Sequence, residues 1–100
     1  MLKCCVVGLG KQAQSDHIPS IVESKDFHLV GVYDVDISAV DFVSQATCSI
    51  PAYSLDEVVA LSPDVVIVSV PHDQYLPIIR RMANEGIHII KEKPFAISIS

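Results

Sequence analysis

Basic residues are scarce in this sequence. Of its 100 residues only seven are Lys or Arg, against twelve Asp or Glu, which gives a formal net charge of −5. A protein that binds a nucleic-acid backbone gathers Lys and Arg on one surface, because their contacts release counterions. Arg80 and Arg81 are the only adjacent basic pair. The composition therefore predicts no nucleic-acid partner.

Long apolar runs and a secretion signal are missing too. No run approaches the ~18 apolar residues of a membrane-spanning helix. The opening residues Met1, Leu2 and Lys3 lack the layout of a signal peptide. The sequence thus predicts a cytoplasmic protein with no membrane partner.

Cysteine occurs only three times. Cys4 and Cys5 are neighbours in an apolar run, so in a strand they point to opposite faces and cannot readily pair, while Cys48 is isolated. No Cys and His spacing is typical of a zinc site. We expect all three cysteines to be small buried hydrophobic residues, and no metal site.

Apolar residues, by contrast, make up 50% of the chain and charged residues only 19%. The length allows one domain over residues 1–100, and the apolar excess indicates a surface that something else covers. β-Branched apolar runs alternate with helical periodicity, as in repeated βα units around a parallel sheet. The predicted strands are 2–8, 27–34, 50–53, 64–70 and 88–90, and the predicted helices are an irregular one over 11–24, then 38–46, one from 55, and 74–85.

Several side chains are predicted to cap these helices or to face inward. "SLDE" at 54–57 matches a capping box, in which Ser54 accepts from the third helical amide and Glu57 reaches back to Ser54. Asp73 is the predicted cap of the last helix, and Gly86 its left-handed end. The predicted inward residues are Val40, Val43, Ala46, Leu55, Val58, Val59, Leu76, Ile79 and Met82.

"GLGKQA" follows the first strand directly and opens the first helix. The pattern is Gly-x-Gly-x-x-Ala, a variant of the dinucleotide-binding fingerprint. Gly8 would make the tight turn, Gly10 would let a pyrophosphate approach the backbone, and Ala13 would let helix and strand pack closely. Phosphates would then meet the amides of a helix N-terminus. The predicted cofactor-binding residues here are Gly8, Leu9, Gly10, Lys11, Gln12 and Ala13.

Asp34 ends the second strand, 24 residues after Gly10. A carboxylate at about this distance accepts from both hydroxyls of the adenosine ribose. A solvated strand end is the alternative, but the preceding glycine turn favours the ribose role. Since a carboxylate repels a 2′-phosphate and no Arg follows to bind one, the cofactor is predicted to be NAD rather than NADP.

The fourth strand ends in "SVPHDQY". Ligands of doubly wound sheets bind over the carboxyl ends of the strands, where the strand order reverses. Val70, Pro71 and His72 are therefore predicted to border the cofactor, and Tyr75 to reach the ribose or to cap the pocket. His72 next to an acidic residue is more typical of a surface position than of a general base.

Five segments, in this order and spacing, resemble the N-terminal domain of the Gfo/Idh/MocA oxidoreductases, the family of glucose-fructose oxidoreductase and inositol dehydrogenase. They are "VVGLGKQAQSDHIPSI", "YDVD", "SLDEVV", "DVVIVSVP" and "IIKEKPFA". The resemblance covers nearly the whole chain, and Glu92, Lys93 and Pro94 are its most specific part. It implies a Rossmann-type, doubly wound α/β fold with strand order 3-2-1-4-5.

The resemblance also implies a hydride transfer between NAD(P) and a hydroxyl or carbonyl carbon of a sugar, cyclitol or related small molecule. The family lysine that matches Lys93 lies beside the nicotinamide ribose and the reacting oxygen, and is the predicted catalytic residue. The family glutamate that matches Glu92 helps to hold this corner, and the family peptide that matches Lys93–Pro94 is often cis. A cation there favours the alkoxide character of the substrate oxygen in the transition state.

The sequence departs from the family in two places. Family members commonly have Thr-Pro-Asn and a later His after the fourth strand, where this chain has Val70, Pro71, His72 and Tyr75. They also continue into a C-terminal domain with the proton-transfer residues, the substrate pocket and usually a homo-oligomer interface, and nothing here corresponds to it. We therefore expect NAD binding from this chain, and no turnover of substrate.

Two other functions fit parts of the pattern. A non-enzymatic sensor of the NAD(P) state would use the same cofactor site without a proton donor. A methyltransferase also uses a glycine turn and an acid after the second strand, but it needs an acidic residue at the end of the first strand, where this chain has Val7.

Overall fold

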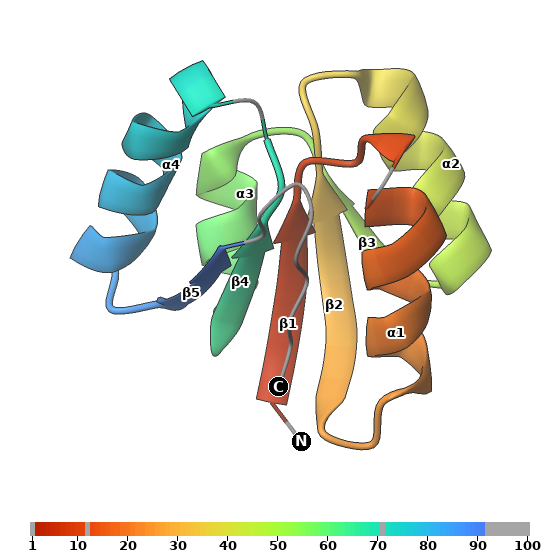
Figure 1. The fold of residues 1–100 in the computed structure, drawn as a ribbon. Helices are drawn as coiled ribbons and strands as arrows, with labels where there is room; N and C mark the ends of the chain where they lie inside the picture. Colours follow the sequence, from red (N-terminus) through yellow and green to blue (C-terminus); the bar gives the residue numbers. More distant parts are fainter. Residues whose placement is uncertain (1, 12, 71, 92–100) are drawn as a thin grey trace.

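The computed structural model describes residues 2–11, 13–70 and 72–91, which build a parallel sheet between two layers of helices (Figure 1). The strand order is β3-β2-β1-β4-β5, with β1 in the middle, which confirms the predicted Rossmann-type fold. The strands are β1 (Leu2–Val7), β2 (Phe27–Tyr33), β3 (Ile50–Ala52), β4 (Val65–Val68) and β5 (His88–Lys91).

Helices cover both faces of this sheet (Figure 1). A π-helical turn, η1 (Ala13–His17), leads into α1 (Ile18–Glu23), which confirms an irregular first helix. Pro19 lies at the start of α1, where a missing N–H is tolerated. The bounds of the others are α2 (Ile37–Thr47), α3 (Leu55–Ala60) and α4 (His72–Asn84). Side chains of α1 and α2 pack on one face of the sheet, and side chains of α3 and α4 on the other.

Successive buried residues along β1, and likewise along β4, alternate between two hydrophobic cores, one on each face of the sheet. Cys4 packs beneath α1 and α2, and Cys5 beneath α3 and α4. Burial raises the pKa of the Cys4 thiol to about 12 and that of Cys5 to about 11, so both stay protonated and behave as small apolar residues. Cys48 contradicts its prediction, because it is exposed and ends α2 in a left-handed conformation.

The phase of two helices differs from the prediction. Leu76 is 62% exposed, whereas Tyr75, Ile78 and Met82 face the sheet. These three residues are three and four positions apart, so they share one face of the helix. Leu76 directly follows Tyr75 and therefore lies off that face. In α2, Ala46 is exposed and Ser44 is buried instead. Asp73 is not the cap of α4, because the helix already begins at His72 and Asp73 lies in its first turn.

The end of α4 follows the prediction. Gly86 has a φ of 73°, and its N–H donates to the carbonyl of Ala83 at 3.0 Å. The N–H of Ile87 donates to the carbonyl of Met82, also at 3.0 Å. This pair of bonds is a Schellman motif, and it turns the chain directly into β5.

The start of α3 is capped nearly as predicted. The hydroxyl oxygen of Ser54 accepts from the N–H of Glu57 at 3.2 Å. The carboxylate of Glu57 reaches one residue further back than in a capping box and accepts from the N–H of Tyr53 at 3.1 Å.

We predict that Ser54→Ala lowers the free energy of unfolding by about 1 kcal/mol, because the Glu57 amide loses its acceptor. Urea denaturation measures this change. Ser54→Thr keeps the hydroxyl oxygen and is expected to unfold close to the parent. An equal loss in the Thr variant would show that the cap does not carry the effect.

Candidate functional site

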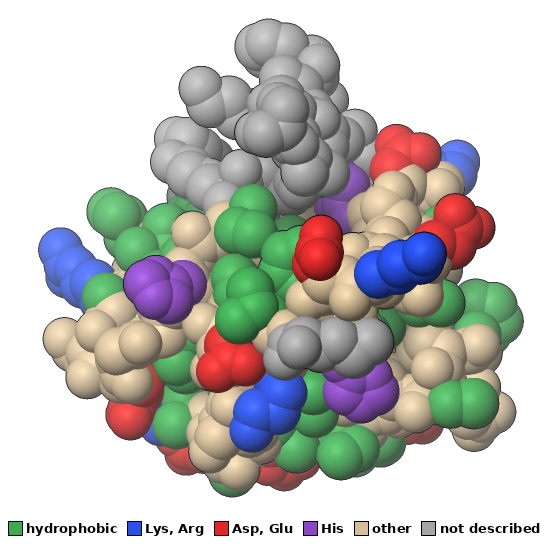
Figure 2. Space-filling model, turned by 90° about the horizontal axis from the view of Figure 1, so that it is seen from below, with side chains coloured by type: hydrophobic (Ala, Val, Ile, Leu, Met, Phe, Trp, Pro, Cys, Tyr) green, Lys and Arg blue, Asp and Glu red, His purple; other side chains and the backbone are tan. Residues whose placement is uncertain are grey.

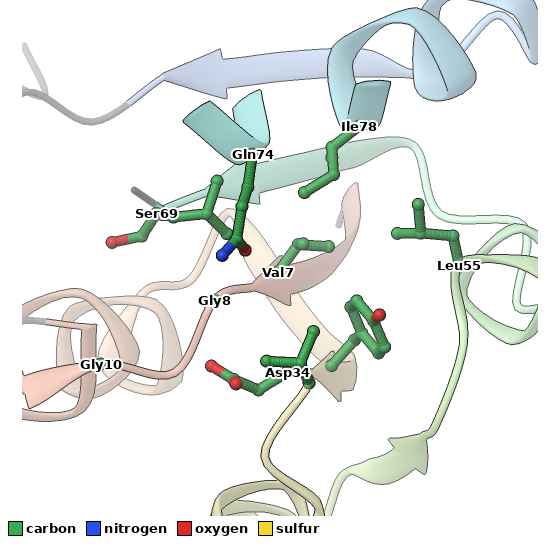
Figure 3. Close-up of a pocket in the computed structure, with 11 residues that line it drawn as sticks. Val7, Gly8, Gly10, Asp34, Leu55, Ser69, Gln74 and Ile78 are labelled. Atoms are coloured by element: carbon green, nitrogen blue, oxygen red, sulfur yellow. The ribbon is translucent and has the colours of Figure 1, made fainter. Parts of the chain in front are cut away.

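A cavity of about 300 Å³ opens at the carboxyl ends of β1, β2 and β4 (Figure 3). Two of its walls come from the chain just after β1 and β2, and the others from α3, α4 and the end of β4. Its lining is mostly apolar, with one carboxylate, one side-chain amide and two hydroxyl groups. The lining residues are Val7, Gly8, Gly10, Tyr33, Asp34, Val35, Leu55, Ser69, Val70, Gln74 and Ile78.

Gly8 makes the turn out of β1. Its φ is 101°, and a Cβ at this position would lie 2.1 Å from the carbonyl oxygen of Ser69. Its N–H donates to the carbonyl of Tyr33 at 2.8 Å, so β1 and β2 remain joined at this point. Only glycine meets both conditions, the left-handed backbone and the close approach of the chain after β4.

Leu9 is held on three sides. Its side chain is 2% exposed and belongs to the core beneath α1 and α2. Its N–H donates to Oδ2 of Asp34 at 2.6 Å, and its carbonyl accepts from Nε2 of Gln14 at 2.7 Å. Two hydrogen bonds and the burial of the Leu9 side chain thus hold the turn between β1 and η1 in this shape.

Asp34 joins the turn after β2 to the glycine turn. Besides the Leu9 amide on Oδ2, its Oδ1 accepts from the N–H of Asp36 at 2.9 Å. A carboxylate has about four acceptor positions. Each oxygen thus keeps room for one further hydrogen bond, and Figure 3 shows the side chain beside the loop of Gly8 and Gly10.

The structure brings four of the predicted site residues together in this cavity, namely Gly8, Gly10, Asp34 and Val70. Ala13 is fully buried where η1 begins, and Lys11 is exposed outside the lining. Tyr75 is 7% exposed and packs in the core beneath α4 rather than in the cavity wall. The other predictions lie outside the described residues or side chains: Gln12, Pro71, His72, Glu92, Lys93 and Pro94.

Leu55 of α3 and Gln74 and Ile78 of α4 were not predicted from sequence as residues of this cavity. Leu55 and Ile78 supply apolar walls, and Gln74 points from α4 toward the glycine turn (Figure 3). The sequence held a signal for Gln74, because this residue lies in the first turn of α4, the helix that follows β4. This position faces the carboxyl ends of the strands in a doubly wound sheet.

The residues that the structure describes contain neither a metal site nor a membrane-spanning helix. No group of three His, Cys, Asp or Glu side chains there could hold a metal ion, and no helix is long and apolar enough to cross a membrane. The amino ends of the strands, seen in Figure 2, show acidic and basic side chains intermixed. The described part of this face therefore carries no field of a single charge sign.

Comparison with solved structures places the same fold in several dehydrogenases. A dehydrogenase (MviM) from Clostridium difficile matches with a TM-score of 0.85 and 22% identity over 98% of this chain and 32% of its own. UDP-N-acetylglucosamine 3-dehydrogenase GnnA from Acidithiobacillus ferrooxidans gives 0.83 and 22% over 97% and 31%. The WlbA dehydrogenase from Bordetella pertussis, in complex with NADH and UDP-GlcNAcA, gives 0.84 and 27% over 95% and 29%.

The chain thus spans about a third of the length of these solved proteins. A search of curated proteins gives no match. A family model described as "Oxidoreductase family, NAD-binding Rossmann fold" matches residues 2–100. The chain therefore belongs to the Gfo/Idh/MocA oxidoreductase family and forms its NAD-binding Rossmann domain.

Proposed function

We propose that the cavity beside Gly8, Gly10 and Asp34 binds the adenosine diphosphate half of NAD, and that the whole protein is an NAD-dependent dehydrogenase of a sugar, a cyclitol or a related small molecule. The observation that carries the proposal is the meeting of a carboxylate and a bare glycine backbone in one cavity. The ribose hydroxyls need the first, and the pyrophosphate needs the second.

The residues present fit such a ligand. Apart from Gly10 and its two neighbours in the chain, no described atom lies within 4 Å of the place where a Cβ of Gly10 would stand, so a phosphate can approach this backbone closely. Asp34 keeps an acceptor position on each oxygen for two ribose hydroxyls. The apolar walls from Leu55 and Ile78 are suited to the flat face of an adenine ring.

The charge around the ribose position favours NAD over NADP. Asp34 would lie against a 2′-phosphate, and the sequence has no Lys or Arg between Lys25 and Arg80. Neither α2 nor α3, which follow Asp34 along the chain, can therefore supply the cation that a 2′-phosphate requires.

The nicotinamide of the bound cofactor supplies hydride transfer. In the proposed reaction the Lys93 ammonium stabilises the negative charge that develops on the substrate oxygen, a role that rests on the resemblance of Glu92, Lys93 and Pro94 to the family motif. The relatives' longer chains support a further domain that carries the substrate. WlbA, in complex with a UDP-sugar acid and NADH, supports a sugar-like substrate.

Titration calorimetry of NAD and NADP into the chain tests the cofactor assignment. We expect NAD to bind at least tenfold more tightly, since NADP adds a phosphate beside the Asp34 carboxylate. Equal affinity for the two, or tighter binding of NADP, would contradict the assignment of Asp34 to the ribose.

We predict that these 100 residues alone do not oxidise substrate, because the proton-transfer groups of the proposed second domain are missing. An absorbance assay at 340 nm with NAD and a panel of polyols, sugars and UDP-sugars measures this. A commercial dehydrogenase added to the same mixture is the positive control. Sustained NADH formation by the chain alone would prove the prediction wrong.

A further inference from the structure

Gln14 is the one residue that bonds two successive peptides of the glycine turn among the contacts of the described residues. Its side-chain Nε2 donates to the carbonyl of Leu9 at 2.7 Å, and its backbone N–H donates to the carbonyl of Gly10 at 3.0 Å. Gln14 itself does not line the cofactor cavity. Its side chain instead lines a depression between α1 and α2, on the helical side of the turn.

These two bonds decide where the following N–H groups point. A trans peptide is planar, and its C=O and N–H point in opposite directions. The peptide that carries the Leu9 carbonyl also carries the N–H of Gly10, and the peptide of the Gly10 carbonyl carries the N–H of Lys11. Because Gln14 draws both carbonyls toward the helix, both N–H groups are turned the other way.

Gly10 lines the cofactor cavity and Gln14 lines the depression between α1 and α2, so the side of the turn opposite Gln14 is the side of the cavity. We infer that Gln14 is a positioning residue for the cofactor phosphates: its side-chain amide turns the Gly10 N–H toward the pyrophosphate. This inference rests on the proposed NAD site. Asp34 holds the preceding peptide through the Leu9 N–H, so the acid that binds ribose and the amide of Gln14 together set the shape of the turn.

Removal of the side-chain donor should therefore weaken phosphate binding and leave ribose and adenine binding intact. Gln14→Met keeps the length of the side chain and loses the donor. We expect its affinity for ADP-ribose to fall about fivefold to tenfold, the effect of one lost hydrogen bond. Its affinity for adenosine, which has no phosphate, should stay within about twofold of the parent by calorimetry.

Gln14→Glu supplies a second, pH-dependent measurement. At pH 7.5 its carboxylate repels the Leu9 carbonyl, and the ratio of ADP-ribose affinity to adenosine affinity should fall at least as far as in the Met variant. Near the usual Glu pKa of about 4.3 the side chain regains a proton and can donate again. The ratio should then recover between pH 7.5 and about 4, where most of the Glu side chains are protonated, whereas a general loss of packing would not respond to pH.

Three results would overturn the inference. In the first, Gln14→Met binds ADP-ribose as tightly as the parent. In the second, it loses ADP-ribose and adenosine affinity in equal measure while its thermal unfolding is unchanged. In the third, the parent chain itself binds neither ligand, which would overturn the proposed cofactor site as well and is seen without any variant.

Discussion

Gly8→Ala is expected to lower the free energy of unfolding by about 3 to 5 kcal/mol and to abolish NAD binding. A non-glycine residue at positive φ costs about 1–2 kcal/mol, and the φ of Gly8 is 101°. The new methyl group would also lie 2.1 Å from the Ser69 carbonyl oxygen and 2.6 Å from its carbon. Both are backbone atoms, so the end of β4 must shift and with it the cavity wall.

Urea denaturation measures this loss of stability. Alanine variants of two other glycines show how much of it comes from the positive φ and how much from the clash of the methyl group. Gly86 also has a positive φ, 73°, but apart from the glycine itself and its two neighbours in the chain no described residue has an atom within 4 Å of its Cβ position, so Gly86→Ala should cost only about 1 kcal/mol. Gly10 has neither the positive φ nor a close neighbour. Gly10→Ala should therefore unfold like the parent and still weaken NAD binding about tenfold or more, because its methyl group would stand where the phosphate of the proposed site approaches. A loss in Gly8→Ala no larger than that in Gly86→Ala would contradict the steric argument.

The centre of the sheet could be predicted from sequence because β4 and most of β1 are buried on both sides. All four residues of β4 are β-branched, and all four are buried. A run of this kind between two helical stretches is typical of a central strand in a parallel sheet. Helix phase is less certain. Along α4 the apolar residues Tyr75, Leu76, Ile78 and Ile79 form a broad stripe, and contact with the sheet selects the edge that contains Tyr75 and Ile78.

In the candidate site, too, some residues could be predicted from sequence and others could not. Gly8, Gly10 and Asp34 could be predicted because local chemistry determines them: a turn, a close approach and an acid at a strand end. Leu55, Gln74 and Ile78 could not, because they reach the cavity only once α3 and α4 have packed on the sheet. Their contribution follows from tertiary structure and has no spacing signal in the chain.

The double role of the carboxylate of Asp34 also lies beyond sequence. The spacing from Gly10 indicates an acid for ribose. In the structure the same carboxylate already accepts from the N–H groups of Leu9 and Asp36. If Asp34 also binds the ribose, as we propose, its removal affects the glycine turn and the ribose contact together, and a large loss of NAD affinity is expected.

Asp34→Ala should lower the affinity for NAD about 100-fold. Two hydrogen bonds from ribose hydroxyls to a carboxylate contribute about 1.5 kcal/mol each at the lower end of their range, and every 1.4 kcal/mol is a factor of ten. NADP should lose much less, because the variant also removes the repulsion of the 2′-phosphate. The preference for NAD is therefore expected to narrow or to reverse in parallel titrations of the two cofactors.

Asp36→Ala is the matched control, because it removes an acid two residues away that performs a structural task. The Asp36 carboxylate caps α2 by accepting from the N–H groups of Ser38 and Ala39, at 3.0 and 3.4 Å. Its loss should cost about 1 kcal/mol of stability and leave NAD affinity unchanged, since its own N–H still donates to Asp34. If both variants weakened NAD equally, general negative charge or helix stability would explain the effect, and the specific contact of Asp34 with the ribose would be wrong.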